Sequence, residues 1–552
     1  MLDRYRIALA QLNPVMGDIA GNLARARAAR GQAAGADIIL FSELFIVGYS
    51  PEDLVLKPAL QEDARAAVEE LARDTQDGGP AILMGAPWVE DGKLYNAMLL
   101  LDGGKVADKS FKADLPNYGV FDEKRVFAAG PAPRPLRVRG VPLGVPICED
   151  IWKQEVCAAL ATSGAEILCV PNGSPFEAGK EDVRLALAAS RVKETGLPLI
   201  YLNQLGGQDE VVYDGASFVL NADGRIVLAL PGWEERVTLS EWQRGADGKW
   251  ACAAGDIFIA EDRSSQVYHA MMLALRDYVN KNRFPGVVLG LSGGIDSALS
   301  AAVAVDALGA SRVRCVMLPS RYTSRESLDD ADACARLLGV AYETIEIERA
   351  VAAMGETLSP AFAGTQTGTA EENIQSRLRG VILMAISNKF GPMVLTTGNK
   401  SEMSVGYATL YGDMCGGYNV LKDIYKTEVF RLSHWRNAHS PAGALGPQGR
   451  VIPERIIEKP PTAELRANQT DQDTLPPYDI LDGILECLVE QECSFQDTVA
   501  RGFDPATVRQ VEHLLYISEY KRRQAPPGVK ISSRNFGRDR RYPITNAFRD
   551  AR

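Results

Sequence analysis

The chain has 552 residues, 46% of them hydrophobic and 24% charged, which is too long for a single hydrophobic core. A formal net charge of −11 argues against a nucleic-acid surface, and no stretch of about 18 apolar residues is present to span a membrane. Nine cysteines without CxxC spacing argue against a disulfide framework and favour a reducing compartment. We therefore expect a cytoplasmic protein of two domains that binds neither nucleic acid nor membrane.

The first half alternates short apolar runs with turns and a few helices, which predicts a layered α/β sandwich. Strands are expected at residues 6–11, 37–41, 81–84, 97–101, 167–170, 199–202 and 217–220, and a helix at 22–33. Segment 241–256 contains several glycines and lacks the periodicity of a strand or helix, so we place the boundary there. The expected domains are residues 1–245 and 264–552, joined by a linker at 246–263.

One cysteine of the first half closes an apolar run, in Val145-Pro146-Ile147-Cys148-Glu149. A strand-to-helix elbow at this point would expose the sulfur and lower the pKa of the thiol through the helix N-terminus. All four histidines lie in the second half, so a carboxylate is the expected proton acceptor. Glu43 follows the strand expected at 37–41, and Lys112 could place a positive charge beside an oxyanion.

The combination of Glu43, Lys112 and Cys148, each in its own sequence context, resembles the nitrilase superfamily over nearly the whole first half. Taken singly, Cys148 is typical of a buried core thiol, and the two charged residues are typical of a surface. The resemblance implies a nitrilase-like α-β-β-α sandwich in which Glu43 is the base, Lys112 stabilises the oxyanion and Cys148 is acylated. In glutamine-using relatives the corresponding residues that hold the substrate are Tyr118, Ser174 and Lys180.

The most informative stretch of the second half is Leu289-Gly290-Leu291-Ser292-Gly293-Gly294-Ile295-Asp296-Ser297. A β-branched pair precedes it and an Ala-rich run follows, which predicts a strand, a Gly-rich turn and a helix N-terminus suited to phosphate. Asp296 would repel phosphate, so its expected role is to hold a divalent cation that the phosphates share. The loop resembles the pyrophosphate loop of N-type ATP pyrophosphatases. The alternative is an ordinary Gly-rich strand-to-helix turn without a role in binding.

Strands and helices alternate beyond this loop, which predicts a doubly wound parallel α/β sheet. The expected elements lie at 314–318, 329–338, 341–347, 372–389 and 393–396, and 438–477 is expected to be a long loop. Polar residues gather at predicted element ends, in 395–402, 411–419, 421–428 and 520–523.

These motifs resemble NAD synthetases, and together with an amidase half they resemble the glutamine-dependent form. The resemblance implies adenylation of nicotinic acid adenine dinucleotide by ATP, then amidation by ammonia released from glutamine, giving NAD, AMP, pyrophosphate and glutamate. It also implies Mg²⁺ as cofactor and a homo-oligomer. The implied ATP-binding residues are Gly290, Leu291, Ser292, Gly293, Gly294, Ile295, Asp296, Ser297, Thr397 and Lys426. The implied dinucleotide-binding residues are Asn373, Glu402 and Lys521, and the implied metal ligands are Asp296 and Glu402.

Other amidotransferases fit the sequence less well. GMP synthetase has a similar loop, but its glutaminase uses Cys and His, and the first half has no His. Asparagine synthetase needs a cysteine directly after the initiator Met, where this chain has Leu2. The alternatives left open are a glutamine-dependent ligase that amidates another carboxylate, a nitrilase-like binding protein with an inactive ATP half, and a plain amidase with an appended nucleotide sensor, which would hydrolyse glutamine without releasing pyrophosphate.

Overall fold

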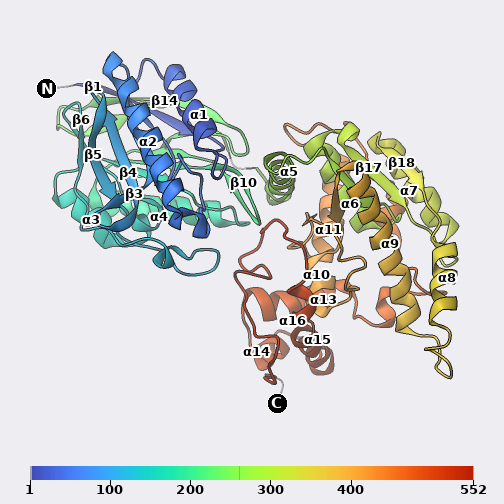
Figure 1. Ribbon diagram of the computed structural model, residues 1–552. Helices are drawn as coiled ribbons and strands as arrows, with labels where there is room; N and C mark the ends of the chain where they lie inside the picture. Colours follow the sequence, from blue (N-terminus) through green and yellow to red (C-terminus); the bar gives the residue numbers. More distant parts are fainter. Residues whose placement is uncertain (1–2, 260, 551–552) are drawn as a thin grey trace. The chain divides into compact units, whose positions relative to one another are not determined.

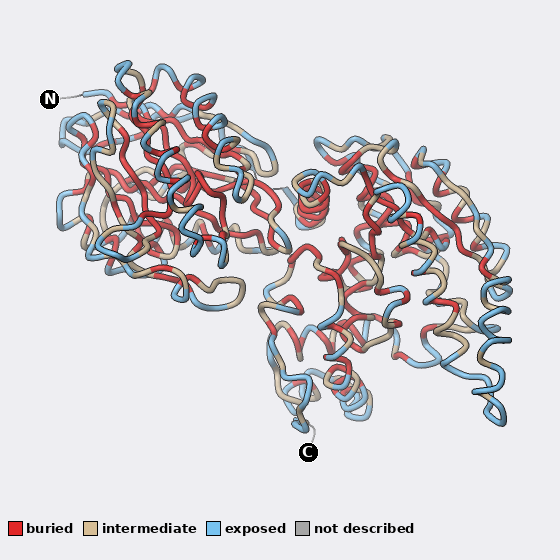
Figure 2. The backbone as a smooth tube through the Cα atoms, in the orientation of Figure 1, coloured by how far each residue is buried: buried red, intermediate tan, exposed pale blue. Residues whose placement is uncertain are grey.

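The computed structural model describes residues 3–259 and 261–550, and the chain divides into two compact units, Met1–Glu261 and Asp262–Arg552 (Figure 1). Each unit has its own buried interior (Figure 2). No helix among the described residues is long and apolar enough to cross a membrane.

Two sheets stacked face to face form the centre of the first unit. One has the strand order β15-β14-β1-β2-β3-β4-β5 and the other has the order β13-β12-β9-β8-β7-β6. The strands of the first sheet are β1 (Arg4–Gln11), β2 (Ile38–Leu40), β3 (Ala81–Glu90), β4 (Lys93–Asp102), β5 (Lys105–Phe111), β14 (Arg236–Arg244) and β15 (Trp250–Cys252). Those of the second are β6 (Leu136–Val138), β7 (Val141–Gly144), β8 (Ile167–Asn172), β9 (Leu199–Asn203), β12 (Phe218–Leu220) and β13 (Ile226–Ala229), with a separate hairpin of β10 (Leu205–Gln208) and β11 (Val211–Asp214).

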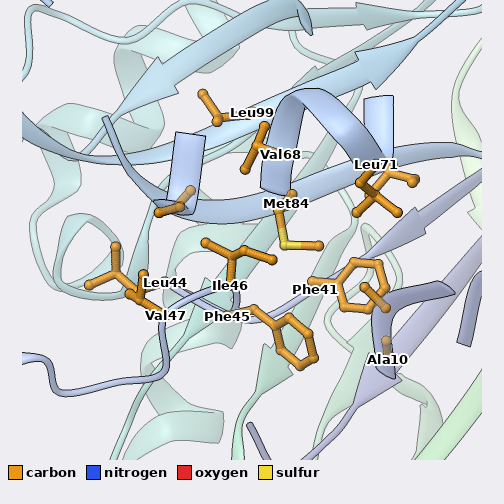
Figure 3. Close-up of a cluster of buried hydrophobic side chains, with 14 of the residues drawn as sticks. Ala10, Phe41, Leu44, Phe45, Ile46, Val47, Val68, Leu71, Met84 and Leu99 are labelled. Carbon is orange, nitrogen blue, oxygen red and sulfur yellow. The ribbon is translucent and has the colours of Figure 1, made fainter. Parts of the chain in front are cut away.

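Helices cover the outer face of each sheet, which confirms the predicted α-β-β-α sandwich. α1 (Ile19–Gln32) and α2 (Pro58–Asp74) pack on the first sheet, where Val68 and Leu71 meet Phe41 and Met84 (Figure 3). α3 (Gln154–Thr162) and α4 (Lys180–Thr195) pack on the second. The alternate residues of both sheets that face each other form a separate apolar core.

The expectation that 241–256 contains no strand is wrong. β14 pairs with β1 over eight residues, β15 pairs with β14, and both Trp242 and Trp250 are buried between the sheets. Asp256 accepts a backbone hydrogen bond from Ala229 of β13. Most of the expected linker 246–263 therefore packs on the first unit; residue 260 lies outside the described part of the chain.

The second unit is built on a five-stranded sheet in the order β18-β17-β16-β19-β20, with every pair parallel, as predicted. Its strands are β16 (Val287–Gly290), β17 (Val313–Met317), β18 (Ala341–Thr344), β19 (Met393–Thr396) and β20 (Tyr418–Asn419). The strand order reverses between β16 and β19, and the carboxyl ends of strands at such a reversal border the usual ligand crevice of this class of sheet.

Helices pack around this sheet, and the last of them ends at Arg522. They are α5 (Arg263–Lys281), α6 (Ile295–Leu308), α7 (Arg325–Leu338), α8 (Glu348–Leu358), α9 (Thr369–Phe390), α10 (Lys400–Val405), α11 (Lys426–Ala438), α12 (Glu454–Glu458), α13 (Tyr478–Leu485), α14 (Phe495–Ala500), α15 (Pro505–Ile517) and α16 (Glu519–Arg522). The stretch 438–477 is mostly loop, as expected, apart from α12 and one short 3-10 turn.

Candidate active sites

Cys148 lies at a sharp turn between β7 and a short 3-10 helix, Cys148–Trp152. Its φ of 47° lies in the left-handed region, and its side chain is buried in the core between the two sheets. Burial raises the pKa of the Cys148 thiol well above its ordinary value; Glu43 adds to the rise and Lys112 opposes it. The expectations of an exposed sulfur and a lowered pKa are therefore wrong, because the turn buries the thiol next to carboxylates.

The Lys112 ammonium is fully buried between two glutamates. Its Nζ lies 2.6 Å from Oε1 of Glu43 and 2.8 Å from Oε1 of Glu123. Burial alone would lower the pKa of Lys112, but the charges of Glu123 and Glu43 raise it well above its ordinary value. Lys112 is therefore a fixed cation, and its charge acts on the Cys148 thiol.

Two further groups orient Glu43 inside this buried cluster. The Asn96 side-chain amide donates to Oε1 at 2.8 Å, and the backbone N–H of Gly173 donates to Oε2 at 3.0 Å. Both carboxylate oxygens of Glu43 thus accept hydrogen bonds, so the carboxylate cannot rotate freely. The structure brings the three residues predicted for amide chemistry into one electrostatic cluster.

Glu123 is the member of the cluster that sequence reasoning missed. It accepts from Lys112 and, at 2.7 Å, from the Tyr49 hydroxyl. Burial is the main cause of a raised pKa for Glu123, although Lys112 opposes the rise. In the sequence Glu123 stands within Asp122-Glu123-Lys124-Arg125, which reads as an exposed charged turn and gives no signal of burial.

The residues expected to hold glutamine occupy different positions around the thiol turn. The Tyr118 hydroxyl donates to Glu149, the neighbour of Cys148, at 2.9 Å. Ser174 is buried after β8, where its hydroxyl accepts from Arg184 at 3.1 Å. Lys180 is half-buried at the start of α4. Arg184 is itself paired with Asp214 at 2.8 Å, so a buried ion pair orders the loop that carries Ser174.

The Gly-rich loop of the second unit runs from the end of β16 into α6, as predicted. The backbone N–H of Ser292 donates to the Ser297 hydroxyl at 3.2 Å, which closes the loop on itself. Gly293 has φ 79°, and a Cβ added there would lie 2.4 Å from the carbonyl oxygen of Ser327, so glycine is required for both reasons. The turn leaves backbone N–H groups at the N-terminus of a buried helix, which suits an anion.

A cavity of about 290 Å³ lies at this loop. All eight residues from Gly290 to Ser297 line it, together with Thr397, Glu402 and Lys426. The ends of β17 and β19 also border the cavity, through Val316 and Thr396. The cavity is therefore placed where the strand order reverses, as expected for a nucleotide site.

Lys426, the first residue of α11, lies between two carboxylates of this cavity. Its Nζ is 2.5 Å from Oδ2 of Asp296 and 3.1 Å from Oε1 of Glu402. Burial alone would lower the pKa of Lys426, but the charges of Asp296 and Glu402 raise it above its ordinary value. Burial is also the main cause that raises the pKa of Glu402, to about 8.

Asn399 links the Asp296 carboxylate to the backbone of Glu402. Its amide nitrogen donates to Oδ1 of Asp296 at 2.9 Å, and its amide oxygen accepts the backbone N–H of Glu402 at 3.0 Å. It is fully buried and caps α10. Sequence reasoning did not single out Asn399.

Asp296 and Glu402 fit a divalent cation in their chemistry. Both supply carboxylate oxygens, and both converge on one cationic group, the Lys426 ammonium. Among the described residues no group of three or more His, Cys, Asp and Glu side chains is arranged to hold a metal. Two carboxylates with the remaining positions left to water and phosphate is the usual arrangement for Mg²⁺.

Asn373 and Lys521 are not among the residues that line the cavity. Both instead hold the segment 406–409, whose Tyr407 and Ala408 do line it. Asn373 accepts from the Thr409 hydroxyl at 2.8 Å, and Lys521 donates to the carbonyls of Gly406 and Ala408, each at 2.7 Å. In this structure the two residues therefore support one wall of the cavity.

Comparison with known proteins agrees with this division of chemistry. A family model described as carbon-nitrogen hydrolase matches residues 6–251, and one described as NAD synthase matches residues 267–525. The glutamine-dependent NAD(+) synthetase of Rhodobacter capsulatus is 56% identical, and that of Xylella fastidiosa (strain 9a5c) is 47% identical, with 100% of both chains covered in each case. The solved structure of glutamine-dependent NAD+ synthetase from Acinetobacter baumannii in complex with adenosine diphosphate superposes with a TM-score of 0.78, at 41% identity and 99% coverage of each chain. The chain belongs to the glutamine-dependent NAD(+) synthetase family.

Proposed function

We propose that this chain forms NAD from nicotinic acid adenine dinucleotide and ATP, with glutamine as the source of nitrogen. One observation carries the proposal: a single chain holds both a buried Glu43–Lys112–Cys148 cluster and a phosphate-loop cavity with Asp296, Glu402 and Lys426. The first arrangement suits amide hydrolysis, and the second suits ATP chemistry. Ammonia made and used by one protein is protected from loss to water.

The glutaminase reaction is assigned to the first unit. Glu43 accepts the Cys148 thiol proton as the sulfur attacks the carboxamide carbon of glutamine, and Lys112 stabilises the resulting oxyanion. The C–N bond then breaks, Glu43 returns the proton and ammonia leaves. Water hydrolyses the thioester to glutamate and frees Cys148. Tyr118, Ser174 and Lys180 are proposed to hold the amino-acid end of the substrate.

The synthetase reaction is assigned to the second unit. The carboxylate of the dinucleotide attacks the α-phosphorus of ATP and pyrophosphate leaves; ammonia then attacks the acyl-adenylate and AMP leaves. Backbone N–H groups of the loop Gly290–Ser297 bind the leaving phosphates, with Thr397 and Lys426 as further ATP contacts. Asn373, Glu402 and Lys521 are proposed as the dinucleotide side of the site.

We also propose that Asp296 and Glu402 hold Mg²⁺ when ATP is bound. The ion supplies positive charge to the phosphates during adenylation. Its binding would free the Lys426 ammonium from its present carboxylate partners. A cytoplasmic homo-oligomer is proposed on the family resemblance alone.

Pyrophosphate release tests the function directly. The purified chain is given glutamine, Mg-ATP and one carboxylate at a time, among them nicotinic acid adenine dinucleotide, nicotinic acid mononucleotide and aspartate. We expect release only with nicotinic acid adenine dinucleotide, accompanied by equal amounts of NAD. Release with another carboxylate, and none with this dinucleotide, would instead establish a glutamine-dependent ligase of different specificity.

A further inference from the structure

A buried aspartate beside the nucleophile has three backbone donors. Asp150 is fully buried two residues after Cys148. Its Oδ1 accepts the N–H groups of Ala113 at 3.0 Å and Asp114 at 2.7 Å, and its Oδ2 accepts the N–H of Ile147 at 2.9 Å.

The donors come from two separate segments, each next to a catalytic residue. Ala113 directly follows Lys112 at the end of β5, and Ile147 directly precedes Cys148. A cap for the 3-10 turn alone would need only the Ile147 bond. The bonds to Ala113 and Asp114 instead tie the turn to a strand end more than thirty residues earlier in the chain.

The three hydrogen bonds to the Asp150 carboxylate are of a kind that holds the two backbone segments firmly in place. Hydrogen bonds to a carboxylate are shorter and stronger than those between neutral groups. Burying the carboxylate costs free energy, and burial raises the pKa of Asp150 to about 7 although the three N–H groups and Lys112 all lower it. An apolar residue would avoid that cost but would leave three N–H groups without this acceptor, that of Ile147 buried and those of Ala113 and Asp114 partly buried.

We propose that Asp150 is a positioning residue of the glutaminase site, which sets the Lys112 ammonium relative to the Cys148 sulfur. It does so by holding the backbone on the C-terminal side of Lys112 and the backbone on the N-terminal side of Cys148 with one carboxylate. The inference rests on the proposed glutaminase function of Cys148 and adds a residue to which the sequence motifs give no role.

The test compares Asp150→Asn with Asp114→Asn in the full chain. Asparagine keeps the shape of Asp150 but offers one acceptor oxygen, so either the Ile147 bond or the Ala113 and Asp114 bonds are lost. Asp114 is in the same segment, but its carboxylate pairs with the Lys153 side chain, at 2.5 Å, on the surface. Measured quantities are kcat and KM for glutamine hydrolysis, ammonia-dependent NAD synthesis, and labelling of Cys148 by a chloroketone analogue of glutamine.

We expect Asp150→Asn to lower kcat for glutamine hydrolysis by about 10- to 100-fold per labelled Cys148, the effect of a displacement of about 1 Å. The KM for glutamine and ammonia-dependent synthesis should remain close to wild type, and Asp114→Asn should behave as wild type in every assay. The number of labelled thiols gives the fraction of intact sites. A fall in kcat per labelled thiol therefore reports misplaced catalytic groups rather than a smaller fraction of folded protein.

Unchanged kcat per labelled thiol in Asp150→Asn would overturn the inference, as would an equal fall in Asp114→Asn. If Asp150→Asn does not fold, Asp150→Glu keeps the charge and moves it by one methylene; a kcat equal to wild type in that variant would also contradict the positioning role. Absence of glutamine hydrolysis in the wild-type chain would refute the proposed function itself, which is a different result.

Discussion

Both candidate sites contain a buried lysine held between two carboxylates, Lys112 in the first unit and Lys426 in the second, and the two clusters differ in how closed they are. In the first unit the side chains of Lys112 and Glu43 are 0% exposed and that of Glu123 is 7% exposed. In the second unit Lys426 is 2% exposed, but its partners Asp296 and Glu402 are 19% and 18% exposed and line a cavity.

The difference matches the two kinds of chemistry. Covalent catalysis by a thiol needs a base and a cation fixed in advance, and a closed ion cluster provides that. A site that takes ATP must exchange partners, because incoming phosphates and a cation compete for the same carboxylates and ammonium. The first cluster is therefore expected to lose function when any member changes, and the second to respond to what is bound.

The largest effect is expected for Glu43→Gln, which keeps the shape of the proposed base and removes its charge. Glutamine hydrolysis should fall by about 10³-fold, the usual scale for loss of a general base. Ammonia-dependent NAD synthesis should be retained, as measured by NAD formed from ammonium chloride at raised pH. Near-normal glutamate production would show that another group takes the thiol proton.

Asp296→Asn tests the cluster of the second unit, where it removes one of the two carboxylates that contact Lys426. Because Asp296 is proposed to hold the cation shared by the phosphates, removing its charge is expected to lower NAD synthesis by about 10²-fold with either nitrogen source. Basal glutamine hydrolysis, followed as glutamate without ATP, should continue. If wild-type and variant synthesis are indistinguishable even at limiting Mg²⁺, Asp296 is not the cation ligand.

Glu123→Gln sharpens the comparison, because it removes one of the two charges around Lys112. The glutamine side chain still offers one acceptor oxygen, but its bond to Lys112 is no longer assisted by a negative charge, so glutamine hydrolysis should fall by about 10-fold. The thermal midpoint should be checked alongside. A loss equal to that of Glu43→Gln would mean that the two glutamates share the proton-transfer role.

The smallest effect concerns the thiol before substrate binds. Since burial and Glu43 raise the pKa of Cys148, the thiol is protonated at neutral pH and its thiolate forms only as pH rises above the ordinary cysteine range. Alkylation of Cys148 by iodoacetamide, followed by peptide mass spectrometry, should be slow at pH 7 and accelerate above pH 9. A rate already at its plateau at pH 7 would indicate a stabilised thiolate instead.

The contrast between the units also shows what the sequence could predict. The phosphate loop was predicted from local features, since a β-branched run, glycines and an Ala-rich helix all lie within about 20 residues. The strand at Met393–Thr396 was predicted at its observed bounds for the same reason. The α-β-β-α sandwich followed from the resemblance and from short apolar runs.

Other features depend on contacts distant in sequence. β5 has the sequence KVADKSF, which is too polar to predict a strand. The strand is stabilised by its pairing with β4. β14 is stabilised by pairing with β1, β15 by pairing with β14, and both by the burial of two tryptophans between the sheets. Glu123 and Asp150 acquire their roles from partners in other segments, so their local sequence carries no signal of burial or function.

The most direct test of separate tasks for the two clusters is the nitrogen-source ratio of Cys148→Ala. NAD formation is measured with saturating nicotinic acid adenine dinucleotide and Mg-ATP, once with glutamine and once with ammonium chloride at a pH where free ammonia is abundant. We expect the glutamine-dependent rate to be lost and the ammonia-dependent rate to equal that of the wild type. An equal fall with both nitrogen sources would contradict it, because the thiol would then take part in NAD synthesis itself.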